Sequence, residues 1–392
     1  MKRSFCLLLL CLTAALIVAV SGGCSEGKPA GENDLASSDL PDRAGSGEND
    51  EKTTQETEEK DMTAAKEYTV TPETFQTIGR YTRASGLTFR YNACGVAFRF
   101  TGSSLEVKLS SSAYNETSYT YAAVYIDGRQ YPIAVTEDGW YTVADGLEAD
   151  SLHTASIIKR SESNCGTLSV EKIRLAPGGE LREAEPYPTD RRIQVLGDSI
   201  TCGFGNLYTE GDVVCYTDFE DGSRTYATMT AARFGAELNT VCISGIGLGT
   251  PDNEPWPILP SYNSADDADF DTFIPDVIVI ALGTNDDAQG ATRAEVAAAG
   301  TELVNFIRSH YPDAEIIWQY GIMSRSSMAG IQDVIAACHA AGDNKIRFLD
   351  AVADTEKEGL GLYAHPSMKT HERLADELTA CIREVTGWDT IQ

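Results

Sequence analysis

From residue 191 onward, short apolar runs alternate with longer stretches whose apolar residues recur at helical spacing. The short runs predict strands at Ile193–Leu196, Glu237–Ile243, Asp276–Leu282, Glu315–Tyr320 and Lys345–Leu349. The longer stretches predict helices at Thr225–Phe234, Arg293–Tyr311, Gly330–Ala341 and Ser367–Thr386. Because parallel strands need a crossover between them, this alternation predicts an α/β domain over residues 190–392, with helices on both faces of a parallel sheet.

Residues 68–180 show a different pattern, in which short alternating or β-branched runs are separated by turn signals. Asp127-Gly128 lies between two apolar runs and is a strong hairpin signal. Several such strands at this spacing predict an all-β sandwich of jelly-roll type. Residues 177–190, with their prolines and glycines, are interpreted as a linker. The clearest runs are Gly95–Phe100, Leu105–Leu109, Tyr121–Asp127 and Leu168–Ile173.

The N-terminus has the pattern of an export signal. Lys2 and Arg3 precede the apolar run Phe5–Val20, which is short for a membrane span, and small residues then lead to Cys24. Residues 1–24 are therefore predicted to be a lipoprotein-type signal peptide, although Ser21 stands where an aliphatic residue is usual. Ordinary cleavage with release is the alternative. Residues 25–67 are acidic and nearly devoid of large apolar side chains, which predicts a disordered tether.

Charge and cysteine usage narrow the class of protein. The formal net charge of −28 argues against nucleic acid and anionic lipid as partners, so membrane attachment is expected only through Cys24. Seven cysteines lie beyond the export signal without CxxC spacing, and no HExxH pattern occurs, so we expect no metal and no cofactor. Cys202 and Cys215 are interpreted either as a disulfide or as buried free thiols.

The predicted strand before residue 197 runs directly into Gly197-Asp198-Ser199, a turn that presents a serine at the carboxyl edge of a sheet. A helix is expected after Gly203 and Gly205, with its amides near the serine. Ester hydrolysis by serine needs a base and oxyanion donors as well as the nucleophile. The chain offers these in later segments, namely Gly245 in Ser244-Gly245-Ile246-Gly247, Asn285 in Gly283-Thr284-Asn285-Asp286, and His365 in His365-Pro366-Ser367.

Each residue receives a role in this hypothesis. Ser199 is the nucleophile and His365 the general base and acid. The backbone amides of Ser199 and Gly245 and the side-chain amide of Asn285 form the oxyanion hole. Trp256 and Tyr262, in the loop after the second donor, are interpreted either as an aromatic wall for a sugar or as residues that pack the loop.

In this order the four motifs resemble the SGNH (GDSL-like) hydrolases, and the C-terminal histidine segment resembles carbohydrate esterase family 2. The resemblance implies an N-terminal jelly-roll-like sandwich followed by a flavodoxin-like, three-layer αβα hydrolase domain. It also implies removal of O-acetyl groups from polysaccharides such as xylan or glucomannan through an acyl-serine intermediate. Two alternatives remain open, a lipid esterase or lysophospholipase of the same superfamily and a non-catalytic surface protein that binds carbohydrate.

Two neighbouring positions depart from the family pattern. Most SGNH enzymes carry an aspartate two residues before the histidine, where this chain has Tyr363, and Ala364 replaces a frequent tryptophan. The departure predicts a Ser–His dyad in which a backbone carbonyl holds His365. Asp350 is expected to end a strand, and the other nearby acidic residues, Asp354, Glu356 and Glu358, are interpreted as solvated loop charges.

The lipoprotein interpretation is tested by Cys24→Ala. We expect the parent protein to sediment with bacterial membranes and the variant to lose its lipid, because the thioether forms on the cysteine sulfur. Mass spectrometry of the mature N-terminus checks this. A free mature N-terminus at another residue contradicts the anchor but leaves export intact.

Overall fold

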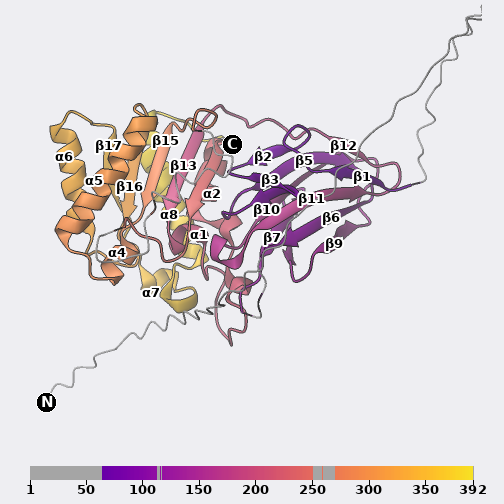
Figure 1. Ribbon diagram of the computed structural model, residues 1–392, viewed down its shortest axis with the longest axis horizontal. Helices are drawn as coiled ribbons and strands as arrows, with labels where there is room; N and C mark the ends of the chain where they lie inside the picture. The colour runs from indigo at the N-terminus through magenta and orange to yellow at the C-terminus, as the bar shows by residue number, and fades with distance from the viewer. Residues whose placement is uncertain (1–63, 113–114, 116, 250–257, 259–269, 392) are drawn as a thin grey trace, which may run out of the picture. The chain divides into compact units, whose positions relative to one another are not determined.

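The computed structural model describes residues 64–112, 115, 117–249, 258 and 270–391, all within one compact unit that spans residues 59–392 (Figure 1). Cys24, Trp256 and Tyr262 lie outside the described residues, so the predictions made for them stay predictions. Within the described part, no helix combines the length and the apolar character that a membrane span requires.

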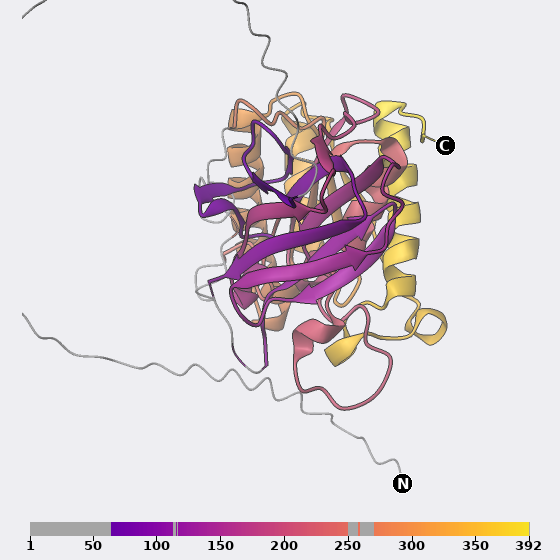
Figure 2. The ribbon, with the colours of Figure 1, turned by 90° about the vertical axis from the view of Figure 1, so that its right-hand side faces the viewer.

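Two antiparallel sheets form the N-terminal sandwich (Figure 2). In the first, the order is β3-β4-β11-β6-β9, with β1 also paired to β11. In the second, the order is β12-β5-β10-β7-β8, with β2 also paired to β5. The first sheet contains β1 (Lys66–Thr69), β3 (Thr82–Ala84), β4 (Gly86–Phe89), β6 (Ser104–Ser111), β9 (Gly139–Asp145) and β11 (Leu168–Leu175). The second contains β2 (Gln76–Ile78), β5 (Gly95–Thr101), β7 (Tyr121–Ile126), β8 (Arg129–Ala134), β10 (His153–Lys159) and β12 (Glu180–Arg182).

Alternation explains why these runs form a sandwich. In β6, Leu105, Val107 and Leu109 are fully buried while the residues between them are only partly covered, as a half-buried strand requires. Asp127 and Gly128 form the two-residue turn between β7 and β8, both with positive φ.

Two sequence boundaries were wrong. Strand β1 begins at Lys66, inside the predicted tether, because its backbone pairs with β11 and Glu67 forms ion pairs with Arg174 and Lys172. Strand β12 lies inside the predicted linker and pairs with β5. Both strands are short and polar, so their pairing depends on partners far along the chain.

The C-terminal domain contains a parallel sheet with the order β14-β13-β15-β16-β17. This is the flavodoxin-like order, as the family resemblance implied. Each predicted strand is present within a residue or two of its predicted bounds. The strands are β13 (Arg192–Gly197), β14 (Glu237–Cys242), β15 (Val277–Ala281), β16 (Glu315–Tyr320) and β17 (Ile346–Asp350).

Helices cover both faces of this sheet (Figure 1). The pair α2 (Tyr226–Phe234) and α8 (Met368–Thr386) shares a core with Val277 and Val279, whereas Ile278 and Ile280 belong to the core that includes α5 (Arg293–His310) and α6 (Met328–Ala340). This alternation along β15 explains why the strand is apolar throughout. The shorter helices are α1 (Ser199–Cys202), α4 (Thr284–Ala288), α7 (Thr355–Glu358), η1 (Ser163–Cys165), η2 (Tyr216–Phe219), η3 (Gly222–Arg224) and η4 (Leu362–Ala364).

Asn92, between β4 and β5, joins the sandwich to the α/β domain. Its fully buried side chain donates to the carbonyls of Thr201 and Cys202 at 3.4 and 3.1 Å, and its Oδ1 accepts from Cys242 Sγ at 2.7 Å. These partners lie at the end of α1 and the end of β14. A sandwich residue therefore supports the segment that follows Ser199.

We expect Asn92→Ala to lower the free energy of unfolding by about 2–3 kcal/mol, because buried carbonyls lose their donor. Asn344→Ala, at an exposed asparagine, is the control and should change it by less than about 0.5 kcal/mol. Urea unfolding of both variants provides the comparison. Equal midpoints and slopes for Asn92→Ala and the parent would contradict this view of the interface.

Candidate active site

Parallel pairing brings the predicted site segments to one edge of the sheet. Gly197, at the end of β13, is in register with Cys242 of β14 and Ala281 of β15. Ser199, Gly245 and Asn285 follow these strands by two to four residues. Because the carboxyl ends of parallel strands meet at the same edge, the three residues emerge from neighbouring positions.

Ser199 is the first residue of α1, which corrects the expectation that a helix begins after Gly203 and Gly205. The Asp198 side chain caps the helix by accepting from Ile200 N–H at 3.0 Å, and α1 ends at Gly203. The sequence interpretation placed the helix too late because it did not treat Asp198 as a cap. As a first-turn residue, Ser199 has a backbone amide without an intrahelical acceptor.

His365 lies beside this serine. The distance from His365 Nε2 to Ser199 Oγ is 2.9 Å, and the serine is 8% exposed. On the other side of the ring, Nδ1 lies 3.2 Å from the carbonyl oxygen of Leu362 and 3.3 Å from that of Tyr363. A proton on Nδ1 is donated to these carbonyls, which leaves the Nε2 lone pair facing the serine hydroxyl.

A close backbone approach makes this contact possible. Leu362 N–H donates to the Gly205 carbonyl at 3.0 Å, and a Cβ on Gly205 would lie only 2.4 Å from Leu362 Cβ. The loop before His365 can therefore reach the loop after Ser199 only where residue 205 has no side chain. Tyr363 and Ala364 both have positive φ, a conformation that turns the chain toward the histidine.

The ring of Phe204 packs against the imidazole. The Phe204 ring lies 4.7 Å from the His365 ring and also stacks with Tyr363 at 6.3 Å. Burial lowers the pKa of His365, against the opposing effect of the carbonyls at Nδ1, so the imidazole is neutral at neutral pH and can accept a proton. The Tyr363 side chain is 71% exposed beside this group. Phe204 was not among the residues predicted for the site. Its position between Gly203 and Gly205, just after the serine, is the only signal of it in the sequence.

Residues that follow β15 hold the loop that contains Gly245. Gly245 has φ +83°, a conformation that favours glycine. Asn285 Nδ2 donates to the Ile246 carbonyl at 2.8 Å and lies 3.5 Å from Asp198 Oδ2, so its amide lies between the two loops. The neighbouring Asp286 accepts from Leu248 N–H at 3.0 Å. Burial raises the pKa of Asp198 to about 7.

The acidic residues described shortly before His365 in the sequence form no hydrogen bond with its ring. Asp350 ends β17, as expected, and pairs with Arg325 at 2.8 Å. Glu358 corrects the sequence interpretation, because its side chain is only 10% exposed and accepts from Arg373 at 2.5 Å rather than standing free in solvent. Asp354 caps α7, and Glu356 is exposed. Among the described residues, His365 Nδ1 has only the carbonyl oxygens of Leu362 and Tyr363 as hydrogen-bond partners.

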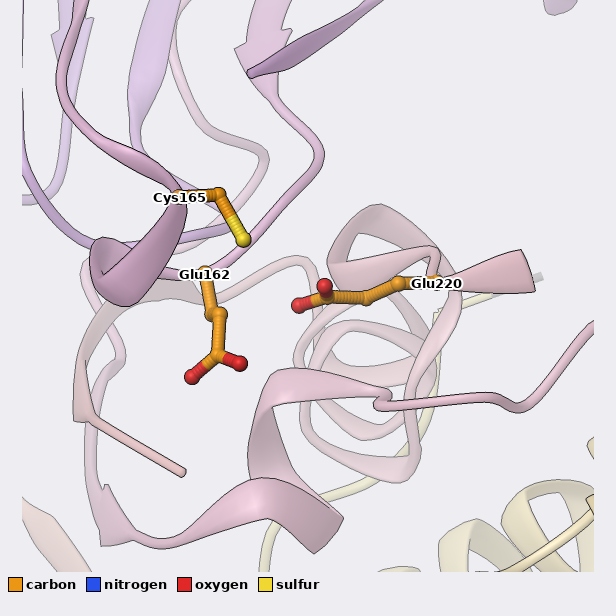
Figure 3. A group of neighbouring side chains, drawn as sticks. All are labelled: Glu162, Cys165 and Glu220. Atoms are coloured by element: carbon orange, nitrogen blue, oxygen red, sulfur yellow. The ribbon is translucent and has the colours of Figure 1, made fainter. Parts of the chain in front are cut away.

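The structure also brings together a buried group that the sequence did not signal. Atoms of Glu162, Cys165 and Glu220 that can ligate a metal lie within 4.8 Å of one another (Figure 3). Burial lowers the pKa of the fully buried Lys159 beside this group, and its electrostatic interactions with all three residues oppose that shift. Glu162 and Glu220 are 58 positions apart in sequence, so only folding makes them neighbours. All seven described cysteines, including Cys202 and Cys215, are free thiols.

Family comparisons agree with this architecture. The model of the GDSL-like lipase/acylhydrolase family matches residues 195–373, and the model of the carbohydrate esterase 2 N-terminal domain matches residues 77–184. The chain resembles the GDSL-like hydrolases over its C-terminal domain. Within them it resembles carbohydrate esterase family 2 over both domains, which confirms the family resemblance and the fold inferred from the motifs.

Individual relatives support the same family resemblance. The cellulase/esterase CelE of Acetivibrio thermocellus is 30% identical over 317 residues, which make up 76% of this chain and 38% of that protein. An acetylxylan esterase/glucomannan deacetylase of Cellvibrio japonicus is 26% identical and covers 78% of this chain and 86% of its own. A family two carbohydrate esterase from Clostridium thermocellum, solved with cellohexaose, is 28% identical with a TM-score of 0.73, covering 80% of this chain and 99% of that one.

The contacts of His365 predict that no carboxylate is needed to orient it. His365→Ala should lower kcat/KM on an acetyl ester by about 10²–10⁴, the usual contribution of a general base. Each carboxylate variant should cost less than about tenfold. The variants are Asp350→Asn, Asp354→Asn, Glu356→Gln and Glu358→Gln. A loss near that of His365→Ala at any of them, in a folded protein, would identify a displaced triad carboxylate.

Proposed function

We propose that this protein is an extracytoplasmic serine esterase that removes O-acetyl groups from carbohydrate. The observation that carries the proposal is the 2.9 Å contact between Ser199 Oγ and His365 Nε2 at the carboxyl edge of the parallel sheet. A neutral imidazole and a serine hydroxyl in this geometry form the nucleophile and base of acyl transfer.

The residues divide the chemistry as follows. Ser199 Oγ attacks the ester carbonyl while His365 Nε2 takes the hydroxyl proton. The negative charge on the carbonyl oxygen is stabilised by the amides of Ser199 and Gly245 and by Asn285 Nδ2. The tetrahedral intermediate then expels the sugar oxygen, which receives the proton from His365. Water, activated by the same imidazole, releases acetate and restores the free serine.

Two carbonyl oxygens replace the usual aspartate in this mechanism. In the free enzyme, the carbonyls of Leu362 and Tyr363 hold the proton on Nδ1 and so fix the productive tautomer. When His365 becomes charged, their dipoles stabilise the imidazolium, although a carbonyl dipole does so less than a full carboxylate charge. The Phe204 ring adds a face that restricts rotation of the imidazole.

A carbohydrate substrate fits the surroundings of the dyad. The exposed Tyr363 ring, stacked on Phe204, offers an apolar face next to the reacting atoms, where a sugar ring can pack. Relatives named as acetylxylan esterase/glucomannan deacetylase, together with a related esterase solved with cellohexaose, support acetylated plant polysaccharide as the substrate class. The formal net charge of −28 argues against a polyanionic partner.

The location is proposed from the N-terminal sequence. A lipid on Cys24 would attach the enzyme to the bacterial surface, and the acidic segment before Lys66 would serve as the spacer. Release after ordinary cleavage is the alternative location. Either one places the site outside the cytoplasm, where polysaccharide is found.

Asn285→Ala tests the oxyanion assignment. We expect kcat for acetate release to fall by about 10²–10³ with the fold retained, because one preorganised donor is lost. Acetylated xylan, glucomannan and a small acetyl ester are the substrates, and circular dichroism checks folding. A folded variant with near-parental kcat would exclude Asn285 from transition-state stabilisation.

Ser199→Ala is the control that separates the alternatives. It should release no acetate above background yet still bind polysaccharide in an affinity gel. Faster hydrolysis of long-chain than of acetyl esters by the parent would favour the lipid esterase. Polysaccharide binding by a parent that hydrolyses neither ester would favour the non-catalytic protein.

A further inference from the structure

The connection between β10 and β11 in the sandwich reaches into the α/β domain and is firmly held. Lys159 Nζ donates to the carbonyls of Ser161 and Glu162 at 2.5 and 2.7 Å. Tyr121 N–H donates to Ser161 Oγ at 2.9 Å, and Thr120 Oγ1 donates to the Cys165 carbonyl at 2.5 Å. Residues 159–165 therefore form a preorganised segment rather than a loose loop.

Two side chains of this segment bind the backbone next to Gly245. Glu162 Oε2 accepts from Ser244 N–H at 2.8 Å, and Asn164 Nδ2 donates to the Ser244 carbonyl at 3.2 Å. The Ser244 carbonyl and the Gly245 N–H belong to the same peptide unit. In a trans peptide these two groups point in opposite directions, so fixing the carbonyl fixes the direction of the N–H.

We propose that Glu162 and Asn164 of the sandwich are positioning residues for the oxyanion hole. Asn164 holds the carbonyl of the Ser244–Gly245 peptide and Glu162 holds the N–H of the peptide before it, so that the Gly245 N–H faces the developing negative charge. The inference rests on the proposed esterase function and on Gly245 as an oxyanion donor. It gives the sandwich a direct part in the rate of the reaction, besides any part in binding polysaccharide.

Burial makes the Glu162 contact the stronger of the two. Glu162 is 1% exposed, so water competes little for its bond from Ser244 N–H, while burial raises the pKa of its carboxyl group. Asn164 is exposed, so water competes for its carbonyl partner and its contribution is smaller. Hydrogen bonds in series polarise one another, and the bond from Asn164 also makes the Gly245 N–H a better donor.

The residue between them provides a matched control. Ser163 belongs to the same segment, and its buried Oγ has no hydrogen-bond partner among the described residues. Ser163→Ala therefore removes an oxygen that forms no hydrogen bond with Ser244 or Gly245. Glu162→Gln is the conservative variant, because its amide oxygen can still accept from Ser244 N–H.

The experiment measures kcat and KM of the full-length protein on a small acetyl ester and on the matching thionoacetyl ester. The sulfur of the thionoester accepts hydrogen bonds weakly, so the ratio of the two kcat/KM values reports on the oxyanion donors. Glu162→Ala should lower kcat by about 10–10²-fold with KM within about twofold. Asn164→Ala should lower it by about 3–10-fold. Glu162→Gln and Ser163→Ala should stay within about threefold of the parent.

The ratio of kcat/KM on the acetyl ester to kcat/KM on the thionoacetyl ester should fall together with kcat in Glu162→Ala and Asn164→Ala. A role in folding alone would leave this ratio unchanged in the folded fraction, and that result would overturn the proposal. A kcat equal to that of the parent in Asn164→Ala would also overturn the proposal. Because this side chain is exposed, we expect the variant to fold. Failure of the esterase function itself is distinguishable, because Ser199→Ala would then be as active as the parent.

Discussion

The parallel pairing of β13 with β14 and β15 is the constraint on which the site depends. It aligns the ends of three strands, so a serine, a glycine loop and an asparagine emerge together from segments that are distant in sequence. Buried apolar residues on both faces fix the sheet, and a shift in register would move every side chain to the other face. The chemistry thus depends on the packing of the central strands.

The sandwich and the α/β domain behave as parts of one active site. Asn92 supports the end of the serine helix, while Glu162 and Asn164 bind Ser244, next to Gly245. Lys159 and Glu220 are also buried, and burial lowers the pKa of the lysine and raises that of the glutamate. Burying so many polar groups between two domains is costly unless they are paired, which favours a fixed interface over a flexible one.

The histidine loop shows how backbone geometry takes over a side-chain role. Tyr363 and Ala364 adopt positive φ, an unfavourable conformation for residues with a Cβ, and the strain places two carbonyls at His365 Nδ1. The position that would carry an aspartate carries an exposed aromatic ring instead. The same substitution therefore changes both the partner of the histidine and the surface offered to a substrate.

The sequence by itself determined the order of strands and helices, because apolar periodicity depends on neighbours a few residues apart. It also identified Ser199, Gly245 and Asn285, whose motifs follow strand ends, and His365, whose motif resembles that of a known family, as candidates. Tertiary structure alone decided which groups meet His365, that Glu358 pairs with Arg373, and that β1 and β12 join the sheets. It alone brought Glu162 to Ser244, 82 positions away. Such contacts leave no local periodicity, because they arise only when separate elements pack together.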